Sequence, residues 1–322
     1  MQRRVAVIGS GLGGLTTALL LSRKGFSVRV FEMANIPGGK ANSLRINNFR
    51  FDTGPSLITM PFVLEEVFKI SGYNLIDYLT LIKLETICKY FYPDKTVISA
   101  YGNLEKFSKE IENKTSDSSN SLKKYFEYCK KIYDLTTEIF LLNSPTNPQN
   151  LLRIKSIKSL LNLKSIDVFR TVDEANKSFF NDPKTIQLFN RYATYSGSNP
   201  YSAPATLNTI QHVEYGLGSN ICEGGVYRIV EVLLNLCKEN GVQFLYNSKV
   251  ENINLHKHRV TGINYLNNGG ISTTENFDVV VSNADVNSTY KNLLGDTTSR
   301  AAKRYESLEP SLSAIVFYWG VK

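Results

Sequence analysis

The sequence of 322 residues lacks any apolar run that approaches the roughly 18 residues of a membrane-spanning helix. Its most apolar stretch, Gly9 to Leu21, is rich in glycine and is interrupted by Ser10 and Thr16. The residues before it predict a β-strand and not a signal peptide. A cytoplasmic protein is therefore expected.

Paired cysteines and clustered histidines are also missing. The four cysteines, at positions 88, 129, 222 and 237, form no Cys-x-x-Cys pair, which argues against a zinc ribbon and a dithiol redox site. Of the three histidines, His256 and His258 would share one face of a strand, but no carboxylate or cysteine cluster accompanies them. The sequence therefore predicts no metal site.

Positive charge is in excess, with a formal net charge of +8. Between Leu151 and Arg170, Asp167 is the only acidic residue, and leucines and isoleucines alternate with basic residues at roughly helical spacing. Such a segment is either an interfacial helix on an anionic membrane or a solvated helix whose apolar face packs inward. Because the basic residues accompany no known nucleic-acid-binding motif, no nucleic-acid partner is expected.

The N-terminal segment predicts a βαβ unit. A short apolar strand, Arg3–Ile8, leads through a glycine-rich turn into a helix over Leu12–Lys24, which Gly25 ends. Alternating apolar residues over Ser27–Glu32 then predict the second strand.

The α/β pattern returns after Gly216, with a helix over Val226–Asn240. Strands are expected over residues 243–246, 249–255, 259–266 and 279–281. The middle differs: Phe62–Ile70 predicts a helix, Leu79–Leu84 and Thr96–Tyr101 predict strands around a Pro93-Asp94 turn, and residues 103–189 are mostly helical.

These observations predict an α/β fold whose Rossmann-like dinucleotide-binding domain is split in sequence by a mainly helical (α+β) domain. The expected divisions are residues 1–75 and 221–300 for the two parts of the nucleotide-binding domain, 76–220 for the inserted substrate or membrane domain, and 301–322 for the start of a further substrate-domain segment.

The glycine-rich turn has the form Gly-x-Gly-x-x-Gly between a strand and a helix. Gly9 permits a tight turn, Gly11 lets the backbone approach a pyrophosphate at the helix N-terminus, and Gly14 lets helix and strand pack closely. Ser10 and Gly13 complete the turn. The pattern alone is weakly specific, so its context decides.

That context includes Glu32 at the end of the second predicted strand. A carboxylate there accepts hydrogen bonds from ribose hydroxyls and would repel a 2′-phosphate. The turn and this carboxylate together therefore indicate NAD or FAD and argue against NADP.

Two downstream motifs favour FAD. Gly38, Gly39 and Lys40 combine a second close backbone approach with a cation, which suits the phosphate on the flavin side. Gly54-Pro55, followed by Ser56, makes a narrow rigid bend that could pass over a planar ring.

Several longer motifs together resemble the bacterial-type phytoene (carotenoid) desaturase family of FAD-dependent oxidoreductases. They are GSGLGGLTTALLLSRKGFSVRVFE, PGGKANS, FRFDTGPSLITMP, EGGVY, SNAD and SAIVFYWG, and, most specifically, RYATYSGSNPYSAPATLNTIQHVEYGLG over residues 191–218. The resemblance implies an FAD cofactor, with contacts that include Gly9, Gly39, Lys40 and Gly54, and a further contact on the adenine side at Val250. It also implies that family members continue beyond position 322, so that the chain is expected to be C-terminally incomplete.

The resemblance implies desaturation of a linear carotenoid precursor such as phytoene. A related 3,4-desaturase, isomerase or saturase is an alternative, as is a non-catalytic remnant or binding partner without a complete FAD site. A lipophilic polyene substrate implies a peripheral position on the inner face of the membrane, while no particular oligomeric state is predicted. Asp52 and Glu214 lie near recognisable motifs, but the sequence identifies no catalytic residue.

The aromatic segment from Tyr192 to Tyr215 has two interpretations that stay open. It either lines an apolar tunnel or packs in a core between the two domains.

Overall fold

The computed structural model describes residues 2–140 and 163–321. The chain divides into two compact units. Unit 1 comprises Met1–Ile82, Ile221–Glu309 and Tyr318–Lys322, and unit 2 comprises Lys83–Asn220 and Pro310–Phe317. An α/β unit split in sequence by a mainly helical segment is the predicted fold class, and it is confirmed.

A four-stranded parallel sheet forms the centre of unit 1, with the strand order β10-β2-β1-β14. Its strands are β1 (Arg4–Ile8), β2 (Ser27–Phe31), β10 (Gln243–Leu245) and β14 (Val279–Ser282). Helices α1 (Leu12–Arg23) and α10 (Tyr227–Glu239) pack on this sheet. A second, antiparallel sheet consists of β11 (Lys249–His256), β12 (Arg259–Leu266) and β13 (Ser272–Asn276).

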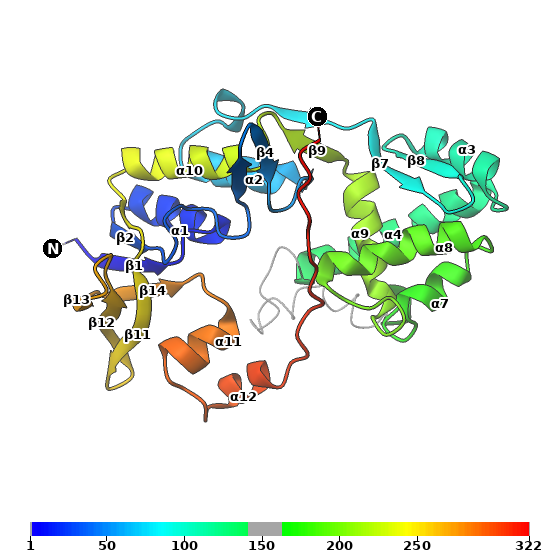
Figure 1. Cartoon of the computed structure of the whole chain (residues 1–322). Helices are drawn as coiled ribbons and strands as arrows, with labels where there is room; N and C mark the ends of the chain where they lie inside the picture. The colour runs from blue at the N-terminus through cyan, green and yellow to red at the C-terminus, as the bar shows by residue number, and fades with distance from the viewer. Residues whose placement is uncertain (1, 141–162, 322) are drawn as a thin grey trace. The chain divides into compact units, whose positions relative to one another are not determined.

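Alternating residues of β1 explain how these layers stack. Val5 and Val7 belong to the core formed with α1 and α10, whereas Ala6 and Ile8 belong to a second core shared with β11 and β12. Successive side chains of a strand point to opposite faces, so that an unbroken apolar strand can bury both faces. Figure 1 shows the helices on one side of the sheet and β11–β13 on the other.

Unit 1 contains further elements. They are the hairpin β3 (Ser43–Ile46)–β4 (Phe49–Asp52), β5 (Ile58–Thr59), α2 (Pro61–Ile70), β6 (Leu81–Lys83), β9 (Ser219–Cys222), α11 (Val286–Ser288) and α12 (Arg300–Glu306). The chain passes between the units within β6, within β9, after Glu309 and after Phe317. The sequence did not predict β3, β4, β9 or β13.

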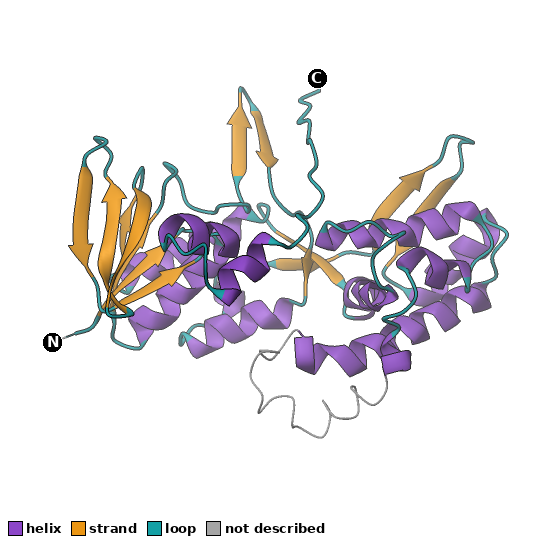
Figure 2. Cartoon of the chain, turned by 90° about the horizontal axis from the view of Figure 1, so that it is seen from below, coloured by secondary structure: helices purple, strands orange, loops and turns teal. Residues whose placement is uncertain are grey.

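The described residues of unit 2 are mostly helical (Figure 2) and include one hairpin. Its elements are β7 (Thr86–Phe91), β8 (Val97–Tyr101), α3 (Leu104–Lys114), α4 (Ser119–Phe140), α7 (Val172–Lys177), α8 (Pro183–Asn190) and α9 (Thr209–Gln211). The prediction that Leu79–Leu84 is the first strand at the Pro93-Asp94 turn was wrong. A tight turn pairs the residues that flank it directly, so β7 is that strand, and β6 belongs to a different sheet.

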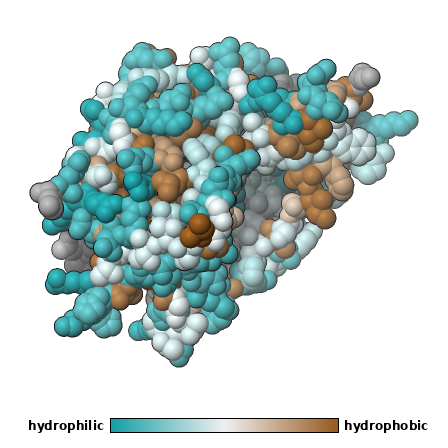
Figure 3. All heavy atoms as spheres, turned by 60° about the vertical axis from the view of Figure 1, so that its left-hand side comes forward, coloured by the Kyte–Doolittle hydropathy of each residue, from teal (hydrophilic) through white to brown (hydrophobic). Residues whose placement is uncertain are grey.

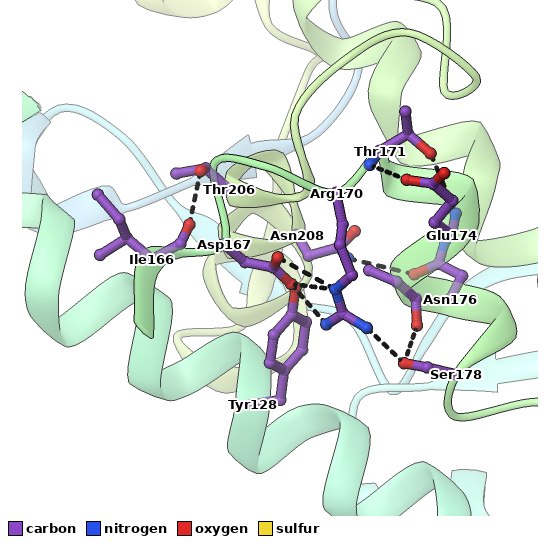
Figure 4. A network of polar contacts seen from close by, with 11 residues as sticks. Tyr128, Ile166, Asp167, Arg170, Thr171, Glu174, Asn176, Ser178, Thr206 and Asn208 are labelled. Atoms are coloured by element: carbon purple, nitrogen blue, oxygen red, sulfur yellow. Dashed lines mark hydrogen bonds and ion pairs between the residues drawn. The ribbon is translucent and has the colours of Figure 1, made fainter. Parts of the chain in front are cut away.

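Part of the predicted basic helix, residues 151–162, lies outside the described residues. The rest does not continue as a helix: Leu163–Ile166 forms a single 3₁₀ turn, and Asp167 has a left-handed backbone (φ 52°). Tyr128 Oη and Arg170 Nη2 each donate to Asp167 Oδ2 at 2.6 Å. Figure 4 shows both side chains converging on this carboxylate, which holds the segment in its bent form.

The aromatic segment contributes mainly to the core of unit 2. Phe189, Tyr192 and Tyr215 are buried in one cluster, while Tyr195 and Tyr201 are exposed. The buried members thus pack in a core, but that core is formed by residues of unit 2 and not by residues of both domains as predicted.

The molecular surface is mixed in polarity. The face drawn in Figure 3 is mostly hydrophilic, with apolar residues in small separate groups. Within residues 2–140 and 163–321, no helix combines the length and the apolarity that crossing a bilayer requires.

Candidate functional site

The glycine-rich turn joins the end of β1 to the start of α1. Gly9 has a left-handed backbone (φ 91°), which glycine adopts without the steric cost of a Cβ atom. A Cβ atom on Gly14 would overlap the carbonyl oxygen of Gly9, so the helix can approach the strand this closely only with glycine at position 14. The glycines therefore have the packing roles that the sequence predicts for this turn.

Glu32 is buried directly after β2 and faces the same turn. Its Oε2 accepts hydrogen bonds from the backbone N and the Oγ of Ser10, at 2.8 and 2.7 Å, and its Oε1 accepts one from Ala34 N at 2.9 Å. A carboxylate oxygen can accept two hydrogen bonds, so Oε1 keeps a lone pair for a ribose hydroxyl. The Ser10 hydroxyl points to Glu32 and thus positions the carboxylate.

The second glycine pair lies against the first turn. Gly38 N donates to Ser10 O at 2.9 Å, and Gly11 and Gly38 form an isolated parallel bridge. A Cβ atom on Gly39 would lie 3.3 Å from the Cα atom of Gly11. The structure therefore brings two glycine motifs, separated in sequence, into direct backbone contact.

The third predicted motif joins this group through Lys40. A Cβ atom on Gly54 would overlap the carbonyl oxygen of Lys40, so only glycine allows these two backbone segments to lie so close. Lys40, Pro55 and Ser56 are exposed. The three predicted motifs are thus adjacent in space within unit 1.

Asp52 holds the start of α10 and does not cap a turn directly after itself. Its Oδ2 accepts from Val226 N at 3.0 Å, and its Oδ1 accepts from Arg50 Nη2 at 2.9 Å. A Cβ atom on Gly225 would overlap the Asp52 carboxylate. The carboxylate therefore positions the Glu223–Tyr227 motif beside Gly38, whose neighbour Pro37 accepts a hydrogen bond from Tyr227 Oη at 3.4 Å.

A cleft of about 760 Å³ opens at the carboxyl ends of β1 and β2. Three predicted residues line it: Gly9, Glu32 and Val250. Its other lining residues are Ile8, Phe31, Met33, Ser248, Lys249, Glu251, Ala284, Asp285, Ser288, Asn292 and Leu293. Ligands of open parallel sheets bind in this position, and the volume is in the usual range for a cofactor site.

Asn283 is a neighbour of the turn to which the sequence gave no role beyond its place in the Ser282–Asp285 motif. It follows β14, and its backbone N donates to Ile8 O at 2.8 Å. Its carboxamide lies over the turn, with Oδ1 2.6 Å from the position of a Cβ atom on Gly13 and Nδ2 3.1 Å from that of one on Gly11. The motif could have been noticed as polar residues after a parallel strand, where ligand-contacting side chains gather.

The residues present fit the adenosine and pyrophosphate part of FAD. The first turn of α1 contains no acidic residue, and no side chain of the described residues caps it. Its free N–H groups and its positive dipole end therefore suit an anion. Glu32 and the cleft offer a ribose acceptor and space for a base, while Asn283 borders the turn.

Glu214, the other candidate carboxylate, is buried in unit 2. Tyr192 Oη donates to its Oε1 at 2.7 Å, and Tyr195 Oη donates to its Oε2. Burial disfavours the phenolate and raises the pKa of Tyr192 well above its ordinary value. Glu214 thus accepts hydrogen bonds inside an aromatic core, which is a structural role.

The fold and the glycine-turn site agree with comparisons to known proteins. Residues 12–314 match the family described as flavin containing amine oxidoreductase, and the chain belongs to this family. An oxidoreductase from Methanosarcina mazei has a similar fold, with a TM-score of 0.63 at 18% identity, covering 95% of this chain and 66% of that one.

Two curated relatives share clearer sequence similarity. The 1-hydroxycarotenoid 3,4-desaturase of Flavobacterium sp. (strain P99-3) is 37% identical over 321 residues, which cover 100% of this chain and 64% of that protein. The 4,4'-diapolycopene oxygenase of Methylomonas sp. is 32% identical, over 99% of this chain and 63% of that protein. The chain therefore spans less than two thirds of the length of these relatives.

These findings confirm the predicted resemblance to carotenoid desaturases and the choice of FAD as the cofactor. The individual cofactor-contacting residues and the division into functional domains stay predictions.

Proposed function

We propose that the protein is an FAD-dependent oxidoreductase that desaturates a linear carotenoid. The observation that carries this proposal is the cleft at the ends of β1 and β2, where Gly9, Glu32 and Val250 meet beside an uncapped helix N-terminus. The names of the two relatives support the substrate class.

In this proposal each motif has a distinct role. The N–H groups at the start of α1 bind the pyrophosphate, Glu32 accepts from the ribose, and Ser10 orients Glu32. Lys40 supplies positive charge next to the Gly54 bend, and Asp52 positions the segment before α10. Bound FAD would supply the acceptor for the two electrons removed from the substrate.

The cofactor part of the proposal is tested by titrating FAD into the purified chain and following the flavin fluorescence. Glu32→Gln keeps the shape of the side chain but replaces the charged carboxylate, which accepts hydrogen bonds from Ser10 and, in this proposal, from the ribose. We expect about tenfold weaker FAD binding, or about 1.4 kcal/mol. Glu65→Gln, on the exposed surface of α2, is the matched control. Equal affinity in all three proteins would contradict the predicted site.

The substrate part has two candidates. One is a phytoene-type precursor, and the other is a hydroxylated carotenoid, which is favoured by the name of the 37% identical relative. The full chain is expressed in hosts that accumulate one or the other polyene, and the pigments are identified by absorption maximum and mass. If the pigment in one host has a longer chromophore than the polyene which that host accumulates, that polyene is the substrate. A heavier pigment with a shorter chromophore would favour a saturase, and a pigment of the same mass with an altered absorption maximum would favour an isomerase. A pigment unchanged in both hosts would favour a non-catalytic partner.

A membrane-resident substrate leads us to propose that the protein contacts the cytoplasmic face of an anionic membrane. Sedimentation of the purified chain with phosphatidylglycerol vesicles, and its release by salt, tests this association. A chain that stays in the supernatant at low salt would contradict it.

A further inference from the structure

A small pocket of about 230 Å³ lies in unit 2 beside the tip of the β7–β8 hairpin. Its lining residues are Tyr90, Phe91, Tyr92, Pro93, Gln187, Leu188 and Arg191. Three of these seven residues are aromatic, and Arg191 is the one cation among them. None of these residues takes part in the site proposed for FAD in unit 1.

Arg191 is held in the pocket by aromatic rings and not by an acid. Its guanidinium carbon lies 4.5 Å from the ring centre of Tyr192 and 5.4 Å from that of Tyr90. Nε and Nη2 both donate to Tyr90 Oη, at 3.2 and 2.8 Å. Among the described residues, no carboxylate forms an ion pair with Arg191 and no acceptor bonds Nη1. A positioned fork with free donors is suited to a phosphate or a carboxylate.

The hairpin places a large apolar group next to this cation. The side chain of Phe91, at the end of β7, is 76% exposed although it lines the pocket. Lys89 and Lys95, on the same hairpin, are also exposed. The nearby acid, Asp94, is paired with Lys184 at 2.8 Å, so the tip keeps an excess of positive charge.

We propose that this tip docks on an anionic membrane, with Arg191 binding the phosphate of a lipid headgroup and Phe91 entering the interface. Aromatic side chains favour the boundary between headgroups and acyl chains, and each nearby basic residue adds to the attraction. The combination of a guanidinium that has no carboxylate partner among the described residues, an exposed ring and two exposed lysines is complementary to such a surface in both charge and polarity.

This inference deepens the proposed function, since it assigns the membrane contact to residues. It can fail on its own, because vesicle binding needs neither FAD nor the polyene. It also competes with one of the two sequence-based interpretations of residues 151–170, in which this segment is the membrane anchor. Phe169 is an exposed, described member of that segment.

The experiment measures sedimentation of the purified full chain with vesicles of phosphatidylcholine alone or mixed with phosphatidylglycerol. We expect binding to the anionic vesicles only, and about fivefold weaker binding for Phe91→Ser and for Arg191→Gln. Arg191→Lys keeps the charge without the fork and should lie between. Soluble glycerol phosphate, added at constant ionic strength, should compete weakly, because it offers no interface to Phe91.

Matched controls separate this surface from general effects. Ile76→Ser removes an equally exposed apolar side chain in unit 1, and Arg45→Gln removes an exposed cation there. Both should bind as the parent chain does, as should Phe169→Ser. Unchanged binding of Phe91→Ser would overturn the inference, and so would a loss confined to Phe169→Ser. Because Phe91 is exposed, its variant folds even if Arg191→Gln does not. If glycerol phosphate displaced the protein from anionic vesicles as effectively as added anionic vesicles do, the ligand of this pocket would be a soluble phosphate and not a membrane lipid.

Discussion

Around the glycine turn of unit 1, the closest contacts are between backbone atoms. In the core of unit 2, the contacts are between buried side chains. In unit 1, Gly14 packs on Gly9, and Gly54 packs on Lys40, with no space for a Cβ atom. In unit 2, stacked rings such as Phe180 and Phe189, with centres 5.1 Å apart, surround buried hydrogen bonds. Motifs of small residues can be identified in a sequence, but the residues that a buried side chain contacts cannot.

The strongest test of this comparison inserts a single methyl group into the backbone contact. Gly14→Ala places a Cβ atom on the carbonyl oxygen of Gly9, and we expect a loss of about 3 kcal/mol in the free energy of unfolding, with loss of FAD uptake. Gly241→Ala is the control, because its left-handed backbone (φ 77°) has nothing within 4 Å of the new atom. It should cost about 1 kcal/mol. Equal losses in urea denaturation would show that the close approach has no special role.

The matching test in unit 2 removes a buried acceptor. Asp167→Ala leaves Tyr128 Oη and Arg170 without their shared carboxylate, and it places alanine where the backbone is left-handed. We expect a loss of about 2 kcal/mol in urea denaturation. Asp134→Ala breaks an exposed pair with Lys130 and should cost about 0.5 kcal/mol at most. A smaller loss for Asp167→Ala than for this control would refute the assigned role of the network.

A charge placed at the turn of unit 1 should separate stability from cofactor binding. Asn283→Asp puts a carboxylate near the positive end of α1, where it favours the helix but repels a pyrophosphate. We expect an unchanged or slightly raised melting temperature without FAD and about tenfold weaker FAD binding. The exposed Asn276→Asp, on β13, controls for the added charge. Unchanged FAD affinity for Asn283→Asp would exclude Asn283 from the border of the pyrophosphate site.

The smallest predicted effect concerns pH and unit 2. Burial disfavours the charged imidazole and lowers the pKa of His212 below its ordinary value of 6.5. The unfolded chain then binds the proton more readily, so the stability present above pH 6.5 is lost as the pH falls through the folded pKa. His212→Gln should give a shallower fall in melting temperature below pH 6.5 than the parent chain gives. Identical pH profiles would contradict the desolvated environment of His212.

Sequence reasoning located the elements that depend on neighbouring residues. β1, α1 and β2 lie within one or two residues of their predicted bounds, and the motifs at Gly9, Gly38 and Gly54 lie side by side. Such predictions succeed because both signals are local. A turn with a left-handed backbone favours glycine, and a strand shows apolar residues at regular spacing.

Elements that depend on distant partners were missed or misplaced. The sequence did not predict β9 or β13, and it paired the wrong strand with β8. Asp52 lies near a recognisable motif, yet no local signal shows that it accepts a hydrogen bond from the backbone N of Val226. Register and pairing follow from burial over the whole chain, which a local pattern does not contain.

By itself, the sequence determined that a strand, a glycine turn, a helix and a second strand follow one another, and that a carboxylate stands at the end of the second strand. Each of these features depends on residues that are neighbours in the chain. Only the tertiary structure decided that Ser10 orients Glu32, that Asn283 borders the turn and that Glu214 lies in an aromatic core. Those relations join residues far apart in the chain, and they form only when packing has brought their elements together.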